Sequence, residues 1–135
     1  MKHGILVTLL AAALFAACTG NPEEKLESSL KAIQATLPKD LGNGVTYNVA
    51  RYDKATKTII FGYVVEYAEE PFTPEVVGLM KTTVQASLSD PSLASDPMWK
   101  AAYQCGAAFR YEYELPAGGG PAGSFTLYPG EYGRY

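Results

Sequence analysis

Residues 107–115 read AAFRYEYEL, and this stretch decides the fold class. Phe109, Tyr111 and Tyr113 alternate with charged residues, and this period of two predicts a strand with one face in the core and the other in solvent. A glycine-rich segment follows at 116–123, and residues 124–128 read SFTLY, which predicts a returning strand. The C-terminal third is therefore predicted to form an antiparallel hairpin.

A second hairpin is predicted upstream. Residues 45–50 alternate between apolar and small or polar side chains, and residues 58–67 are rich in β-branched and aromatic types. The polar residues 53–57 between them fit a hairpin connection. In the second strand both faces are apolar, since Ile60 and Val64 lie opposite the presumed core positions.

Three helices are indicated by a capping residue followed by proline, at 21–37, 73–88 and 96–105. Pro38 is expected to end the first helix, and Gly106 suits the left-handed residue that closes the third. The sequence thus predicts an α+β fold in the order α-β-β-α-(α)-β-β. We expect an antiparallel sheet of about four strands with two or three helices packed on one face.

The composition is that of one globular domain and excludes a basic nucleic-acid-binding surface. A length of 135 residues fits one domain, and a hydrophobic fraction of 47% with 19% charged residues is typical of a chain that buries a core. Lys and Arg number 11 against 14 Asp and Glu, so no basic footprint for nucleic acid is present. No nucleic-acid partner is expected.

The N-terminus reads as an export signal, with a charged start and the apolar run 5–17, which is too short to span a bilayer comfortably. The run ends in Leu14-Phe15-Ala16-Ala17-Cys18, which resembles the lipobox of bacterial lipoproteins, although Leu is more common than Phe three residues before the cysteine. The resemblance implies a signal peptide at 1–17, acylation of Cys18 and a lipidated tether at 18–22. Residues 23–135 would then form a single domain.

Location follows from the same resemblance. Thr19 stands where lipoproteins retained at the inner membrane often carry Asp, which implies an outer-membrane anchor facing the periplasm. A tether of so few residues would hold the domain against the lipid headgroups. An ordinary secretory signal or a short anchor helix is the alternative, and without lipidation Cys18 and Cys105 could pair as a disulfide.

Catalytic chemistry finds little support. Cleavage before Cys18 removes His3, the single histidine, and lipidation leaves one thiol, so no catalytic residue, metal site or cofactor is predicted. Glu112 and Glu114 share a strand face and could form an acid/base pair, but a solvated charged stripe is the favoured interpretation. Cys105 is expected to act as a small core hydrophobe.

Two surface regions are candidates for binding. The glycine run could form a mobile loop that orders on a partner, and a phosphate loop is excluded because a strand follows it. The other candidate is the face of the sheet opposite the core, which mixes aromatic, aliphatic and charged side chains. The loop comprises Gly118, Gly119 and Gly120, and the face comprises Tyr52, Ile60, Val64, Arg110, Glu112 and Tyr128.

Residues 96–132 resemble the C-terminal hairpin of small uncharacterised bacterial envelope lipoproteins, a similarity that implies no activity. The main hypothesis is a membrane-tethered, non-enzymatic envelope lipoprotein that acts as a protein-binding or structural module. Its expected partners are the membrane, through the lipid, and an envelope protein. The alternatives are an inhibitor or immunity-like lipoprotein that blocks an envelope enzyme, and a glycan-interacting protein.

Overall fold

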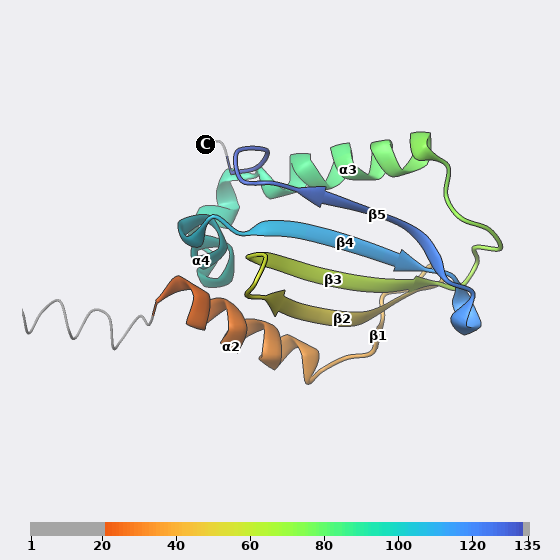
Figure 1. The fold of residues 1–135 in the computed structure, drawn as a ribbon, viewed down its shortest axis with the longest axis horizontal. Coiled ribbons are helices and arrows are strands. Elements are labelled where there is room, and N and C mark those ends of the chain that lie inside the picture. Colours follow the sequence, from red (N-terminus) through yellow and green to blue (C-terminus); the bar gives the residue numbers. More distant parts are fainter. Residues whose placement is uncertain (1–20, 134–135) are drawn as a thin grey trace, which may run out of the picture.

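A computed structural model describes residues 21–133 as a sheet with helices packed on one face (Figure 1). The predicted signal peptide and the predicted lipidation site Cys18 lie outside the described residues. Within the described part, no helix is long and apolar enough to cross a membrane. In chain order the elements are α2 (Pro22–Gln34), β1 (Lys39–Asp40), β2 (Val45–Asp53), β3 (Thr58–Val65), α3 (Pro74–Leu88), the 3-10 turn η1 (Pro91–Ser95), α4 (Pro97–Cys105), β4 (Ala108–Glu114), the 3-10 turn η2 (Pro116–Gly118) and β5 (Pro121–Leu127).

The five strands lie in the order β1-β2-β3-β4-β5, and β3 pairs with β4 in parallel while the other neighbours are antiparallel. The predicted α+β class is confirmed, but the sheet is mixed rather than entirely antiparallel. The two hairpins are joined through α3, η1 and α4, and this long crossover returns the chain to the end of the sheet where β3 starts. The additional strand β1 has two residues, too few to show a periodic pattern.

The helix starts agree with the prediction. Asn21, Thr73 and Asp96 each accept a hydrogen bond from the backbone N–H three residues later, at 2.8, 3.3 and 3.0 Å. Gly106 closes α4 with a φ of +66°. The helix α2 ends at Gln34, three residues earlier than expected, because the chain tightens into i to i+3 hydrogen bonds before Pro38.

The core lies between the helices and one face of the sheet. A C-terminal residue completes it: Tyr132 is 2% exposed and donates its hydroxyl to the backbone oxygen of Ala107 at 2.5 Å. Its ring also meets Phe109 edge-on, with centroids 5.0 Å apart. The tail thus folds back onto the domain. Other buried core residues are Leu26, Leu30, Ile59, Phe61, Trp99 and Leu127.

Candidate functional site

A bulge in β2 exchanges the two faces of that strand. Tyr47 pairs with Tyr63, but the next pair joins Val49 to Gly62, so Asn48 is an extra residue. Beyond the bulge the even-numbered positions face the helices. Tyr52 therefore lies on the core face, where its hydroxyl donates to Glu23 Oε2 at 2.7 Å. The prediction that Tyr52 belongs to the open face is wrong, because strict alternation fails across one extra residue.

A glutamine of α2 holds the bulge in place. Gln34 Oε1 accepts the backbone N–H of Ala50 at 2.8 Å, and Gln34 Nε2 donates to the backbone oxygen of Asn48 at 3.2 Å. On the partner strand a Cβ at Gly62 would lie 2.8 Å from the Cβ of Val49, so the bulge needs glycine there. The sequence offers Gly62 as the one local sign of this irregularity.

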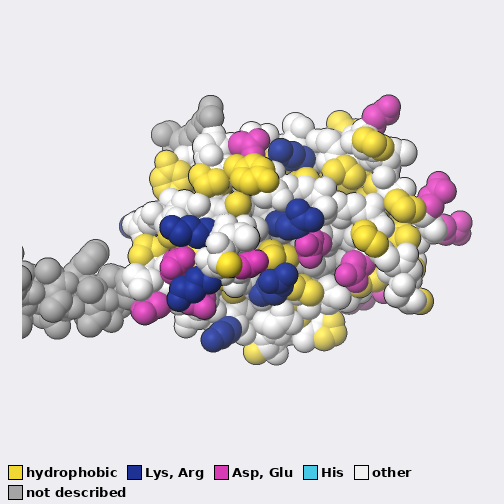
Figure 2. All heavy atoms as spheres, viewed as in Figure 1, with side chains coloured by type: hydrophobic (Ala, Val, Ile, Leu, Met, Phe, Trp, Pro, Cys, Tyr) yellow, Lys and Arg dark blue, Asp and Glu magenta, His cyan; other side chains and the backbone are white. Residues whose placement is uncertain are grey.

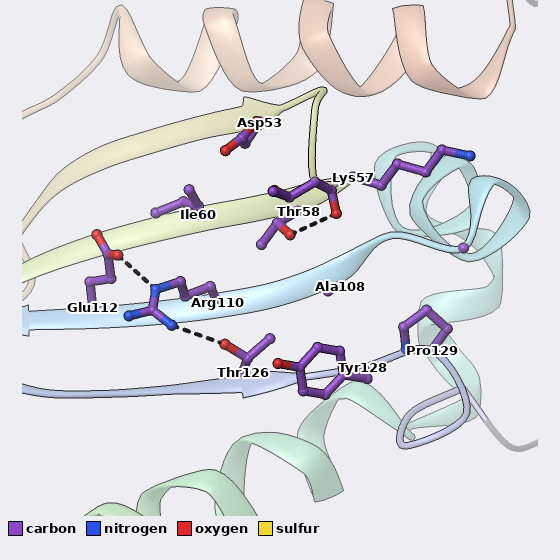
Figure 3. Close-up of a pocket in the computed structure, with 12 residues that line it drawn as sticks. Asp53, Lys57, Thr58, Ile60, Ala108, Arg110, Glu112, Thr126, Tyr128 and Pro129 are labelled. Carbon is purple, nitrogen blue, oxygen red and sulfur yellow. Dashed lines mark hydrogen bonds and ion pairs between the residues drawn. The ribbon is translucent and has the colours of Figure 1, made fainter.

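The other five residues of the predicted face share the side of the sheet opposite the helices, which we call the open face. Ile60 pairs with Arg110, and Val64 pairs with Glu114 across the parallel strands. Figure 3 shows Ile60, Arg110, Glu112 and Tyr128 on this side, contributed by β3, β4 and the residue after β5. The topology therefore brings these residues together, and Tyr52 is the exception.

Arg110 makes the centre of the open face polar, because hydrogen bonds to β4 and β5 side chains hold its guanidinium across the strands. Its Nε donates to Glu112 Oε2 at 2.8 Å, its Nη1 to Thr126 Oγ1 at 3.2 Å and its Nη2 to Ser124 Oγ at 3.1 Å. Ile60 is only 5% exposed, so the apolar group that the sequence placed on this face is covered by its neighbours. In the view of Figure 2, basic and acidic side chains lie next to one another across the sheet.

A shallow concavity of about 470 Å³ lies over the first half of β3 and β4 on the open face. Figure 3 shows its lining, with Thr58 and Ile60 from β3, Arg110 from β4, and Thr126 and Tyr128 at the β5 side. Asp53 and Lys57 close its end at the β2–β3 turn. The arrangement can offer hydrogen bonds and one aromatic ring, but no nucleophile with a base.

Tyrosines form a layer on the helix-facing side of the same strands. The Tyr63 ring stacks on Tyr47 and on Tyr113, with centroids 5.1 and 5.2 Å apart, and Tyr111 stacks on Phe125 at 5.2 Å. Burial raises the pKa of Tyr63 and of Tyr111 far above the ordinary tyrosine value. These hydroxyls stay neutral at physiological pH and act as packing groups.

An apolar groove of about 500 Å³ opens between this layer and α3, and we call it the aromatic groove. Tyr63, Tyr111 and Tyr113 form its floor, while α3 forms one wall. That wall is loosely packed, since none of the residues of α3 is buried and the lining residue Val76 is 40% exposed. Further lining residues are Leu41, Tyr67, Phe72, Val76, Met80 and Val84.

Acidic residues follow the edge of the aromatic groove. Residues 66–75 run from the end of β3 into the first turn of α3 and contribute Tyr67 and Phe72 to the lining. They contain four glutamates and no Lys or Arg. All four are exposed: Glu66, Glu69, Glu70 and Glu75. The groove therefore combines an apolar interior with a negative rim.

The glycine loop is a compact turn. Leu115 N–H donates to the Gly120 oxygen at 2.8 Å, and Gly119 N–H donates to the Pro116 oxygen at 3.1 Å. Gly118 and Gly120 have φ values of +72° and +92°, which glycine adopts without strain. The expected mobility of Gly118, Gly119 and Gly120 stays a prediction.

Cys105 packs at the edge of the core, half-buried, and burial raises the pKa of its thiol. A thiol with a raised pKa is a poor nucleophile at neutral pH. Among residues 21–133, no group of three or more His, Cys, Asp or Glu side chains could hold a metal ion.

Comparison with known proteins shows the fold. No family model and no curated protein sequence matches the chain. A solved structure described as a secreted protein of Pseudomonas aeruginosa is similar with a TM-score of 0.58 at 15% identity, covering 82% of this chain and 91% of that one. The pilotin EpsS of the Vibrio vulnificus type 2 secretion system is similar with a TM-score of 0.53 at 10% identity, covering 84% and 93%. The chain therefore shares its α+β fold with a secreted protein and with a secretion-system pilotin.

Proposed function

We propose that this chain is a lipid-anchored, non-enzymatic envelope lipoprotein that binds a protein partner in the aromatic groove. The observation that carries the proposal is the incompletely packed wall of the groove: no residue of α3 is buried, and its lining residue Val76 is 40% exposed. An amphipathic helix in a globular protein ordinarily buries its apolar stripe. Here part of that stripe is left for another molecule.

The lining suits a protein ligand. Tyr and Met are enriched at protein interfaces, where tyrosine supplies rigid contact area and methionine adapts its shape. Tyr63 and Tyr113 provide the rigid contact area, and Met80 provides the adaptable side chain. The negative rim favours a partner segment that carries apolar side chains together with Lys or Arg.

The anchor rests on the signal sequence. With Cys18 acylated and the first helix starting at Pro22, the domain would lie close to the membrane, at the outer membrane facing the periplasm if sorting follows Thr19. A fold shared with a secreted protein and a pilotin supports a place in the envelope. Replacing Cys18 by Ser should move the protein from the membrane fraction to the soluble one and abolish labelling with palmitate.

Site-specific photo-crosslinking in intact cells tests the groove. A crosslinking residue at Val76 or Tyr67, which both line the groove, should capture one dominant envelope protein. The captured peptide should contain apolar side chains with Lys or Arg nearby. The matched control is Tyr103 on α4, which is 53% exposed and remote from the groove lining. Equal capture from Tyr103, or capture from Tyr67 that survives Val76→Glu, would contradict the proposal.

The identity of the captured protein also separates the alternatives. A partner that is an envelope hydrolase whose turnover falls on binding would make this chain an inhibitor. A structural partner would make it a binding or assembly module.

A further inference from the structure

We infer that the open face binds an uncharged oligosaccharide, a stretch of envelope glycan, on a platform made by Tyr128 and Arg110. This site is separate from the aromatic groove, since Arg110 and Tyr128 line the concavity on the other side of the sheet. It therefore stands independently of the proposed protein-binding function.

Tyr128 supplies the platform. Its side chain is 59% exposed, and Figure 3 shows the ring face-on beside Thr126 at the border of the concavity. The backbone that carries this ring is held in place, because the backbone N–H of Tyr128 donates to Glu131 Oε1 at 2.8 Å. An exposed aromatic ring is an amphipathic surface, and the C–H faces of a pyranose ring can pack flat against it while the sugar hydroxyls remain hydrated.

Arg110 supplies oriented donors. A guanidinium has five N–H groups. Three of them donate to Glu112, Thr126 and Ser124, which leaves two N–H groups for a ligand. The three bonds hold the planar group in one orientation across the strands, which lowers the entropic cost of binding. Hydroxyls of the same concavity, such as Thr58 and Thr126, can both donate and accept, as sugar hydroxyls require.

The charge of the concavity selects the class of ligand. Lys57 and Arg110 stand against Asp53 and Glu112, so the lining is formally neutral. A neutral surface gives no attraction for nucleic acid or anionic lipid, whose binding depends on an excess of positive charge. Its volume of about 470 Å³ lies within the range of roughly 300 to 1,000 Å³ for small-ligand sites.

A protein partner fits this surface poorly. Lys, Glu and Asp are depleted at protein interfaces, whereas Lys57, Glu112 and Asp53 all line the concavity. The isoleucine of the concavity, Ile60, is only 5% exposed, so neighbouring side chains already shield it from a partner. A polar ligand that exchanges hydrogen bonds with held side chains suits the site better than an apolar protein surface.

Calorimetric titration tests the inference on the full chain in a zwitterionic detergent that carries no sugar headgroup. The probe is chitotetraose, an uncharged oligomer of N-acetylglucosamine. Saturable binding is expected, with Tyr128→Ala raising the Kd at least tenfold and Tyr128→Phe staying within threefold of the unmodified protein, because the ring and not the hydroxyl makes the platform. Arg110→Met keeps the aliphatic cover and should also weaken binding about tenfold.

The matched control is Tyr67→Ala, which removes another exposed tyrosine from the aromatic groove. Tyr67→Ala should leave chitotetraose binding unchanged and reduce protein capture in the aromatic groove. Tyr128→Ala should weaken chitotetraose binding and leave protein capture unchanged. Absence of heat up to 10 mM probe, or equal losses for Tyr67→Ala and Tyr128→Ala, would overturn the inference. Tyr128 is exposed and its recorded hydrogen bond uses the backbone, so the alanine variant should keep the thermal unfolding midpoint.

Discussion

The two sides of the sheet are built from the same strands and have opposite chemistry. On the helix side, Tyr47, Tyr63 and Tyr113 stack in a row, and Tyr63 and Tyr113 line the aromatic groove. On the open side, Arg110 links Glu112 to Thr126 around a neutral concavity. One alternating pattern can therefore supply two surfaces of different chemistry, an apolar groove on one side and a polar concavity on the other.

Tyr52 lies on the core face only because Asn48 is inserted in β2. Without the bulge, Ala50 and Tyr52 would turn to the open face and Arg51 would turn toward α2. The difference between the sides therefore depends on one residue as well as on the alternation.

Deleting Asn48 should have the largest effect on this contrast. The shortened strand would bring Arg51 into the core face and remove the backbone groups that Gln34 holds, so we expect loss of cooperative unfolding in urea. The control is Asn48→Ala, which keeps the residue count and the backbone bond to Gln34 and should change the free energy of unfolding by less than about 1 kcal/mol. A deletion variant with near-native stability would show that the strand can slip.

Truncations on opposite sides of the sheet should differ severalfold in cost. Phe109 is 2% exposed and packs on Phe61 and Tyr132, so Phe109→Ala should cost about 3–5 kcal/mol of unfolding free energy. Val64 on the open face is half-buried, and Val64→Ala should cost less than about 1 kcal/mol. Equal losses in urea denaturation would indicate that another layer covers the open face.

The tail that closes the core should contribute a smaller amount. Tyr132→Phe keeps the ring but leaves the buried oxygen of Ala107 without its hydroxyl donor, which should cost about 1–3 kcal/mol. Thermal unfolding of the two proteins measures the difference. An unchanged midpoint would mean that water replaces the hydroxyl.

The smallest effect concerns pH. Burial raises the pKa of Tyr63, Tyr111 and Tyr132 well above the unfolded value near 10, so the unfolded chain releases these protons first. Their stabilisation is fully present well below pH 10 and is lost as the pH rises through 10 toward the folded values. From pH 9 to 10 each tyrosine should lose about 0.4 kcal/mol, measurable as a falling urea midpoint. A midpoint that rises over this interval would reverse the sign.

Local pattern predicted most of the elements. The alternation at 107–115, the caps at Asn21, Thr73 and Asp96, and the left-handed Gly106 all recur in the structure because each depends on residues a few positions apart. Five of the six residues assigned to the open face lie there, since β3 and β4 keep strict alternation. The pattern failed at Tyr52, because the bulge at Asn48 interrupts the alternation of β2.

The sequence by itself determined the α+β class and the helix boundaries within a few residues, because these depend on composition and short-range periodicity. The export signal and its cleavage before Cys18 stay predictions. Tertiary structure alone decided the parallel pairing of β3 with β4, the Gln34 clamp on the bulge and the aromatic groove beside α3. Each of these joins segments distant in the chain. Such contacts form only when the whole core packs, and no local pattern records which segments will meet.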